Sequence, residues 1–405
     1  MSTARLYYYA RAHIARLFGA VALLSASFDA GCSPDRVLQP DSDGEVALTT
    51  PQGLENTVAG LGAPVPISFD TYERSRQVVH ASAVEFASPW HGQRFWLALT
   101  PYPNSDSRVE NPSLFTSASG DDWVVPTGVT NPVAKSGRGY LSDPELAYDP
   151  TSDELRLYYR EVIQTRHGHQ KPKHRADVLN LTRSGDGAQW SPPQALVTDV
   201  GRFVVSPTVA RRAEGDWKLW SVDAGVKGCN ARETRVIMRQ STDGIAWSQA
   251  TATSLSQPGF LPWHLDVQYV PQLNAYWALV VAYPRGTACT GSSLFLATST
   301  DGVQWTTYSS PLLARGALPQ FSTNVYRSTF AFEPDGESLT IWLTGATTVT
   351  RADHRRPRVL RWSAAVWRTQ TAALLEHVHS ERRALTFADS EPSFLRRLAA
   401  ENKLP

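Results

Sequence analysis

The chain has 405 residues, and its 39 lysines and arginines nearly balance its 38 aspartates and glutamates, so the formal net charge at pH 7 is +1. This balance argues against general nucleic-acid binding, which needs a basic surface. Aromatic residues make up 10% of the chain and include 13 tryptophans, while 26 glycines and 27 prolines divide it into short segments. Such a composition is typical of an all-β repeat fold, and exposed aromatic rings suit stacking on sugars.

The first residues have the pattern of an export signal. Three arginines precede the apolar run 17–24, which is too short to span a bilayer. The run is followed by Ala-Gly-Cys at 30–32, which resembles the cleavage site of bacterial lipoproteins. The resemblance implies that residues 1–31 are a signal peptide and that Cys32 is lipidated. We therefore expect an exported, lipid-anchored protein of the bacterial cell envelope, with plain secretion as the alternative.

The segments at either end of the repeat region differ from it in composition. Residues 32–64 are rich in Pro, Asp, Gly and Thr, which is typical of a flexible tether. Strand patterns run from about residue 65 to about residue 370. The charged segment 371–405 is predicted to be a partly helical tail that packs at the periphery.

One short phrase recurs within residues 65–370. Ser, Asp-Gly and Trp occur together at 184–190, 241–247 and 299–305, and a weaker copy lies at 117–123. Successive Ser positions are 67, 57 and 58 residues apart, and a period of this size indicates a repeat fold. Asp-Gly supplies the positive φ that a tight hairpin turn needs. Four equivalent turns cannot all lie at one active site, so we interpret each Asp as a turn clamp rather than a catalytic residue.

Each repeat has an apolar strand, an aromatic strand, a third strand that leads into the recurring phrase, and a fourth strand after it. Five such units fit residues 65–370. This predicts an all-β fold, a five-bladed β-propeller of four-stranded antiparallel blades. The fifth unit lacks the phrase, and its third strand is predicted at 359–362. Ring closure is predicted to borrow a strand from 65–68.

The recurring phrase resembles the Asp box, or BNR repeat, of sialidases and related β-propellers, although it is one residue shorter and lacks the Thr. The fold resembles the five-bladed propellers of arabinanase- and xylosidase-like glycoside hydrolases. Those enzymes place an Asp in the first blade, an Asp before a Pro in the second and a Glu in the third. Only Asp143-Pro144 matches this pattern, because His80 and Ser206 occupy the other two places.

Strands alternate in direction within a blade, so the starts of all first strands share one face with the loops between second and third strands. These strand starts and loops are rich in carboxylates. Glycosidic cleavage needs one carboxyl group as the acid and a second as the base or nucleophile. The residues predicted to be catalytic are Asp143, Glu110 and Asp266. The residues predicted to bind substrate are His80, Glu145, Arg160, Trp263, His264 and Arg327. The alternative for each is a structural role in closing the inner ring.

Cys229 and Cys289 fall in equivalent loops of adjacent units, which in an exported chain predicts a disulfide. No metal or other cofactor is predicted, because the histidines of the loop 166–175 lack nearby carboxylates. The resemblance allows Ca²⁺ in the channel, as in some five-bladed relatives, although no ligand motif indicates it.

We therefore predict a cell-surface carbohydrate-active protein that acts as a glycoside hydrolase through carboxylates around Asp143. Basic side chains such as Arg160 and Arg327 favour an anionic glycan. One alternative is a lipoprotein that binds glycans without cleaving them, and another is a structural or adhesion propeller. The expected partners are a polysaccharide or glycoconjugate and, through the lipid, a membrane. The chain is predicted to be a monomer.

Overall fold

A computed structural model describes residues 61–165, 173–333, 336–350 and 358–385. The predicted signal peptide, the lipidation of Cys32, most of the tether and most of the loop 166–175 lie outside these residues. Among the described residues, no helix combines the length and the apolar character that crossing a bilayer requires.

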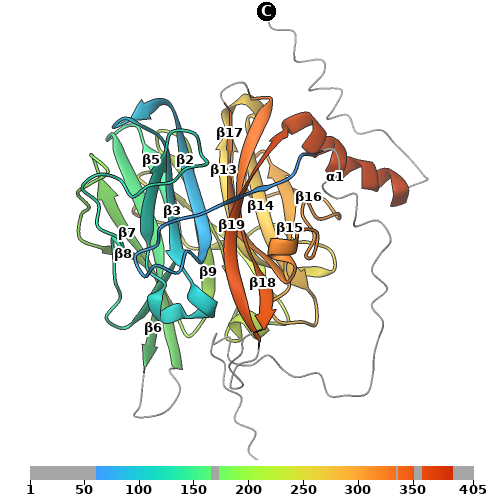
Figure 1. Cartoon of the computed structure of the whole chain (residues 1–405), viewed down its shortest axis with the longest axis horizontal. Coiled ribbons are helices and arrows are strands. Elements are labelled where there is room, and N and C mark those ends of the chain that lie inside the picture. Colours follow the sequence, from blue (N-terminus) through green and yellow to red (C-terminus); the bar gives the residue numbers. More distant parts are fainter. Residues whose placement is uncertain (1–60, 166–172, 334–335, 351–357, 386–405) are drawn as a thin grey trace, which may run out of the picture.

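The described residues form five antiparallel sheets, which Figure 1 shows side by side. The first sheet contains β2 (Val78–Trp90), β3 (Gln93–Pro101) and β4 (Ser113–Ser117). The second contains β5 (Gly139–Asp149), β6 (Glu154–Thr165), β7 (Lys173–Ser184) and β8 (Gln194–Val200). The third contains β9 (Val204–Ala213), β10 (Asp216–Asp223), β11 (Arg235–Ser241) and β12 (Thr251–Ala252).

The remaining elements follow in chain order. The fourth sheet contains β13 (Phe260–Val270), β14 (Ala275–Pro284), β15 (Ser293–Ser299) and β16 (Thr306–Thr307). The fifth contains β17 (Asn324–Phe332), β18 (Ser338–Thr350), β19 (Arg358–Gln370) and, from the other end of the chain, β1 (Val65–Ile67). One α-helix, α1 (Thr371–Leu385), follows β19 directly. Short 3-10 helices lie at η2 (Pro103–Ser105), η3 (Ser107–Val109), η4 (Gly228–Asn230), η5 (Pro271–Leu273) and η6 (Pro319–Phe321).

The first strands of the five sheets contact one another in a closed ring, in the order β2, β5, β9, β13, β17 and back to β2. Side chains make the hydrogen bonds between neighbouring first strands. Each junction has a side chain bonded to a backbone group of the next strand: Ser82 with Leu146, Glu145 with Val209, Ser206 with Leu265, Gln268 with Phe330, and Thr329 with Ala83. Polar side chains, most of them buried, therefore add hydrogen bonds between sheets that no backbone ladder joins.

Arg327, Glu145 and Asp266 form a central network inside this ring. Arg327 is fully buried and donates to Glu145 Oε2 at 2.5 Å and to the carbonyl oxygens of Pro144 and Pro207. Glu145 also accepts from side chains and a backbone amide of β2 and β9. Burial and the neighbouring Glu145 charge raise the pKa of Asp266 to about 8. Every carboxylate and guanidinium of the network contacts protein groups, so these contacts favour a structural role for all three residues.

The fifth sheet closes with a strand from the other end of the chain, as the sequence predicts. Val65 pairs with Val366 and Ile67 pairs with Ala364, which places β1 at the outer edge beside β19 (Figure 1). The third strand expected at 359–362 is part of the longer β19.

The first sheet has three strands, so the prediction of four is wrong there. Thr116 forms a single bridge to Val124, and no fourth strand of this sheet follows among the described residues. The side chain of Asn131 takes its place: its Oδ1 accepts from Leu114 N at 2.8 Å and its Nδ2 donates to Leu114 O at 2.9 Å. These are the outward backbone groups that a fourth strand would have bonded.

Three of the four recurring turns have the hydrogen bonds of an Asp clamp, whereas in the weaker copy at 117–123 the carboxylate of Asp121 bonds to Arg368. In the turn at 299–305, Asp301 Oδ1 accepts from the amides of Val303 and Gln304 at 2.7 and 2.8 Å, and Ser299 Oγ accepts from Gly302 N at 2.8 Å. The turns at 184–190 and 241–247 repeat this pattern. The interpretation of these Asp residues as clamps agrees with this geometry.

The glycine of the turn also contacts an aromatic side chain of the preceding sheet. Trp220 of β10 donates its indole N–H to Gly302 O at 2.8 Å, and a Cβ at Gly302 would lie 2.7 Å from that ring. Trp342 and Tyr158 make the same bond to Gly120 and Gly244. The recurring Ser-Asp-Gly-Trp segment therefore forms a turn, and its glycine also packs against the neighbouring sheet.

The first prediction concerns the packing of this glycine. We expect Gly302→Ala to lower the free energy of unfolding by about 1–3 kcal/mol more than Gly215→Ala, because it adds overpacking to the strain of a positive φ. Gly215 has a φ of 72° and open space around a new Cβ, so it is the matched control. Chemical denaturation of both variants measures the difference, and equal losses would contradict the packing role.

The second prediction concerns Asp266. Its folded-state pKa lies above the unfolded value, so the stability that it contributes is present at low pH and is lost as the pH rises toward about 8. Asn mimics the protonated carboxyl at every pH. The melting temperature of Asp266→Asn, relative to the parent, should therefore increase between pH 5 and pH 9. A difference that does not change with pH would show that Asp266 is ionised in the folded protein.

Candidate functional site

The site begins with irregularities at the starts of the first strands. His80 in β2 and Asp143 in β5 have positive φ values of 60° and 51°, and the strand register shifts beside each of them. A further shift lies beside His264 in β13. A bulge turns a side chain out of the regular alternation of a strand and is common next to functional sites. Here three bulges in three sheets aim their side chains at one point.

His80, Asp143 and His264 form a buried cluster, called the His/Asp cluster below. Asp143 Oδ1 lies 3.4 Å from His80 Nε2 and 3.2 Å from His264 Nδ1. None of the three residues is more than 3% exposed. None of these three atoms has a well-aligned hydrogen-bond partner within the described part of the chain, although burying such atoms unpaired is costly.

The other polar atoms of Asp143 and His80 do have partners. Asp143 Oδ2 lies 3.1 Å from Ser142 Oγ and 3.2 Å from a terminal nitrogen of Arg160. His80 Nδ1 lies 3.1 Å from Thr100 Oγ1. When Nδ1–H donates to Thr100, the lone pair of His80 is on Nε2, which is the nitrogen that faces Asp143.

The protonation states follow from burial and charge. Burial lowers the pKa of both His80 and His264, and the attraction of Asp143 does not offset it. Burial alone would raise the pKa of Asp143, but His80, His264 and Arg160 hold it well below its usual range. Near neutral pH the cluster therefore consists of two neutral imidazoles and one carboxylate.

This donor set fits a divalent metal ion. One ligand atom from each of the three residues lies within 4.8 Å of the others. A tetrahedral zinc site with bonds of about 2.0–2.1 Å places its ligand atoms about 3.3 Å apart, close to the separations of Asp143 Oδ1 from the two nitrogens. Neutral imidazole and ionised carboxylate are also the protonation states that bind metal. Three protein ligands leave coordination positions open, which is typical of catalytic rather than structural sites.

Glu110 lies beside the cluster, in the loop between η3 and β4, and hydrogen bonds hold this loop in place. Its Oε1 is 3.6 Å from His80 Nδ1, and its carbonyl oxygen accepts from Leu141 N in β5. Tyr72 donates its hydroxyl to Val109 O at 2.6 Å and accepts from Asn111 Nδ2, which fixes both sides of Glu110. Burial and the charge of Asp143 raise the pKa of Glu110 well above its ordinary value.

Aromatic rings form one wall of the site. The ring of the half-buried Tyr326 lies 4.3 Å from that of His264 and 5.2 Å from that of His80, measured between ring centroids. Trp362 packs behind Tyr326, and the half-buried Tyr102 packs against Trp362. The cluster is thus bordered by Tyr326 of the fifth sheet, with Trp362 and Tyr102 packed behind it.

The structure divides the predicted site residues into two groups. His80, Glu110, Asp143, Arg160 and His264 come together at the His/Asp cluster. Glu145, Asp266 and Arg327, predicted to bind substrate or catalyse, lie in the central network and contact one another or protein groups.

Trp263 differs from its prediction. Only 4% of it is exposed, and its ring packs against His264 and Tyr283. A sugar cannot stack on a ring that is covered in this way.

Sequence reasoning did not bring His80, Asp143 and His264 together as a candidate metal site. Its ligands come from three different sheets, so no local spacing joins them. The hydroxyl groups of Thr100 and Ser142 were also missed, and no pattern in the sequence marks them.

The predicted disulfide between Cys229 and Cys289 is present, with an S–S distance of 2.04 Å. It joins the loops that follow β10 and β14 in neighbouring sheets.

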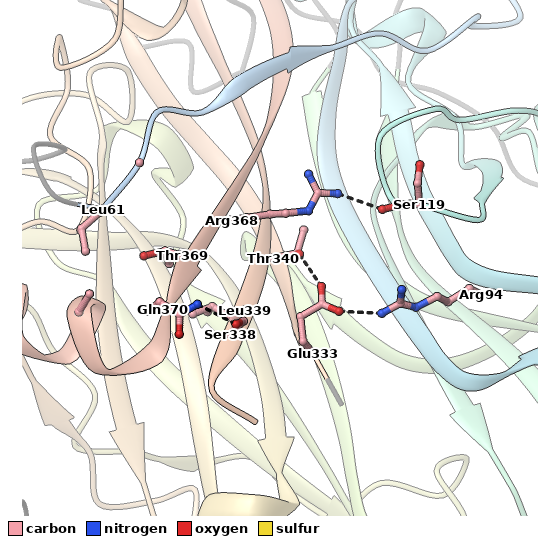
Figure 2. A pocket seen from close by; sticks show the side chains of 12 residues that line it. Leu61, Arg94, Ser119, Glu333, Ser338, Leu339, Thr340, Arg368, Thr369 and Gln370 are labelled. Atoms are coloured by element: carbon pink, nitrogen blue, oxygen red, sulfur yellow. Dashed lines mark hydrogen bonds and ion pairs between the residues drawn. The ribbon is translucent and has the colours of Figure 1, made fainter. Parts of the chain in front are cut away.

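A cavity of about 630 Å³ lies among the start of β18, the end of β19, Arg94 of β3 and the start of α1 (Figure 2). Figure 2 shows that its charged side chains are paired: Arg94 bonds to Glu333, Glu333 to Thr340, and Arg368 to the carbonyl oxygen of Ser119. No residue of the His/Asp cluster lines it.

Comparison with known proteins points to carbohydrate-active enzymes. No family model matches the chain. The chain is 30% identical over 343 residues to the A type blood N-acetyl-alpha-D-galactosamine deacetylase of Flavonifractor plautii. The match covers 74% of this chain and 42% of that protein, so the chain spans less than half the length of this curated relative.

Two solved structures resemble this chain to different degrees. The chain superposes with a TM-score of 0.68 and 25% identity on the N-acetylgalactosamine deacetylase from F. plautii in complex with blood group B trisaccharide, over 78% of this chain and 97% of that one. It also matches a thermostable family-43 glycoside hydrolase with a TM-score of 0.46 and 15% identity, over 71% and 89% of the two chains.

The third prediction is that the His/Asp cluster takes up one divalent metal ion per chain. Zinc titration by calorimetry should show one tight site in the full chain, and Asp143→Asn and His264→Ala should each abolish it, since each removes a ligand. His91→Ala is the control, because His91 is exposed and lies outside the cluster. Equal zinc uptake by the parent and both ligand variants would rule out a metal site here.

Proposed function

We propose that this protein is a carbohydrate-active hydrolase that removes the acetyl group from an N-acetylated amino sugar of a glycan. The His/Asp cluster carries this proposal, because its three unpaired donor atoms suit a metal ion better than they suit glycosidic cleavage. The likeness to a deacetylase in sequence and in structure supports the choice of reaction.

Amide hydrolysis needs a polarised carbonyl, an activated water and a proton for the departing amine. A divalent metal ion supplies the first two when it is bound, by acting as a Lewis acid and by lowering the pKa of water. His80, Asp143 and His264 would hold it and leave part of its coordination sphere open. Because Thr100 engages Nδ1 of His80, the Nε2 of this residue stays available as a ligand.

Glu110 is the candidate for proton transfer. Its carboxyl lies 3.6 Å from Nδ1 of His80, and its raised pKa favours the protonated form that a general acid needs. A positive ion at the cluster would lower that pKa again, so the proton affinity of Glu110 would follow the occupancy of the site. The ring of Tyr326 offers an apolar surface beside the cluster for one face of a sugar.

A glycoside hydrolase is the second candidate, and one observation favours it. The pKa of Asp143 is lowered while that of the nearby Glu110 is raised, and such a pair of carboxyl groups can act as base or nucleophile and as acid. The binding protein without turnover, predicted as an alternative from the sequence, is the third outcome of the test below.

We extend the proposal to the architecture and the location. The five sheets and the closed ring of first strands support a five-bladed β-propeller, and the clamped turns support the predicted Asp-box repeat. The chain would be an exported monomer, anchored through lipid on Cys32, that meets glycans outside the cell. Arg160 and Arg327, the basic side chains expected to favour an anionic glycan, are buried and paired with carboxylates, so they do not support an anionic ligand.

The fourth prediction tests the reaction. The purified chain, loaded with zinc, is incubated with glycans that end in N-acetylgalactosamine, and both released acetate and new reducing ends are measured. We expect acetate and free amine without new reducing ends. Asp143→Asn should lose at least about 100-fold in rate while it keeps the parent's circular dichroism spectrum, because it removes a ligand.

The controls separate the three candidates. New reducing ends without acetate would establish the glycoside hydrolase in place of the deacetylase. Neither product, with glycan binding still detected, would establish the binding protein. A chelator should stop acetate release, whereas it should leave a metal-independent glycosidase active.

A further inference from the structure

Behind Asp143 lies a buried row of charged side chains that the proposed reaction does not use. Arg160 Nε is 3.1 Å from Asp177 Oδ2, and Asp177 Oδ1 is 2.9 Å from His174 Nε2. The side chains of these three residues are each no more than 8% exposed. The row runs from the edge of the second sheet, at His174 in β7, to Asp143 in β5.

The far end of this row is firmly held. Asp177 accepts from the backbone amide of Val204 at 2.8 Å, which ties it to β9 of the third sheet. The imidazole of His174 stacks on Phe203, with ring centroids 3.9 Å apart. Asp177 is therefore a fixed anion, and its position does not depend on Arg160 alone.

Arg160 connects this fixed anion to the His/Asp cluster. One terminal nitrogen of its guanidinium lies 3.2 Å from Asp143 Oδ2, and its Nε lies 3.1 Å from Asp177 Oδ2 in an ion pair that lacks the alignment of a hydrogen bond. The guanidinium is planar and rigid, so fixing one edge also fixes the direction of the other. Only Oδ2 of Asp143 is engaged in this way, and Oδ1 is left facing His80 and His264.

We propose that Asp177, acting through Arg160, is the positioning residue that keeps Asp143 Oδ1 turned toward His80 and His264. This inference rests on the proposed function, because it gives Asp177 a part in forming the metal site. Without Asp177, the buried Arg160 would have Asp143 as its remaining carboxylate. A guanidinium prefers to bind a carboxylate through both oxygens, and that would draw Oδ1 away from the cluster.

A purely structural role for the row makes a different prediction. Arg156 and Asp149 form a second buried pair between β5 and β6, with an N–O distance of 2.5 Å, at the other end of the same sheet. Removing the carboxylate of Asp149 breaks a buried ion pair of the same sheet but leaves the row behind Asp143 intact. Asp149→Asn is therefore the matched control for Asp177→Asn.

The fifth prediction uses zinc alone as the probe, titrated into the full chain by calorimetry. Asp177→Asn should weaken zinc binding about 10–100-fold, the usual effect of losing a partner behind a metal ligand, while Asp149→Asn should stay close to the parent. Arg160→Lys should show the same loss as Asp177→Asn, since one ammonium cannot hold both carboxylates in a fixed direction. It keeps the charge, and it serves as the test should Asp177→Asn fail to fold.

The outcomes separate this inference from the function beneath it. A parent that takes up no zinc would overturn the proposed metal-assisted reaction and this inference together. A parent that binds zinc, with an unchanged affinity in folded Asp177→Asn or Arg160→Lys, would overturn the positioning role alone. Equal weakening by Asp149→Asn would do the same, because it would show that the loss reflects general damage to the sheet.

Discussion

The contacts of Arg327 with β5 and β9 are the constraint on which the rest of the structure depends. Five sheets meet around an axis where their backbones do not pair, and the fully buried guanidinium bridges Glu145 and two carbonyl oxygens there. Breaking a buried ion pair by removing one partner typically costs about 3–5 kcal/mol, because the other charge is left uncompensated. Because Arg327 and Glu145 compensate each other, the inner ring contains buried charges close to the site and still has defined side-chain positions.

The same ring explains where the chemistry lies. First strands packed around a common axis bring their starts together, and bulges at His80 and Asp143 turn side chains inward that a regular strand would place elsewhere. Left-handed backbone at residues other than glycine costs of order 1–3 kcal/mol, which is characteristic of functional sites. Contacts to Nδ1 of His80 and Oδ2 of Asp143 leave the inner atoms of these two residues unpaired, and neither ring nitrogen of His264 has a well-aligned partner among the described residues. The unpaired inner atoms are the property from which we infer a metal.

The sequence predicted much of the fold because the relevant signals are local or periodic. The Ser-Asp-Gly-Trp phrase marked the turns, its spacing marked the repeats, and Cys229 and Cys289 lay in equivalent loops. The three-stranded first sheet was missed, because the substitution of Asn131 for a strand depends on a tertiary contact. The candidate site was predicted as a set of residues but not as a geometry. Which carboxylates face Arg327 and which face histidine depends on bulges of one residue, and no spacing in the sequence reveals them.

The most direct test of the central claim is anomalous diffraction from crystals of the full chain grown with zinc, recorded on both sides of the zinc absorption edge. Our account predicts one strong anomalous peak in contact with His80 Nε2, Asp143 Oδ1 and His264 Nδ1, with Arg160 still on the opposite oxygen of Asp143. An empty cluster in crystals that bind zinc elsewhere would contradict it, and so would a zinc ion held by other residues.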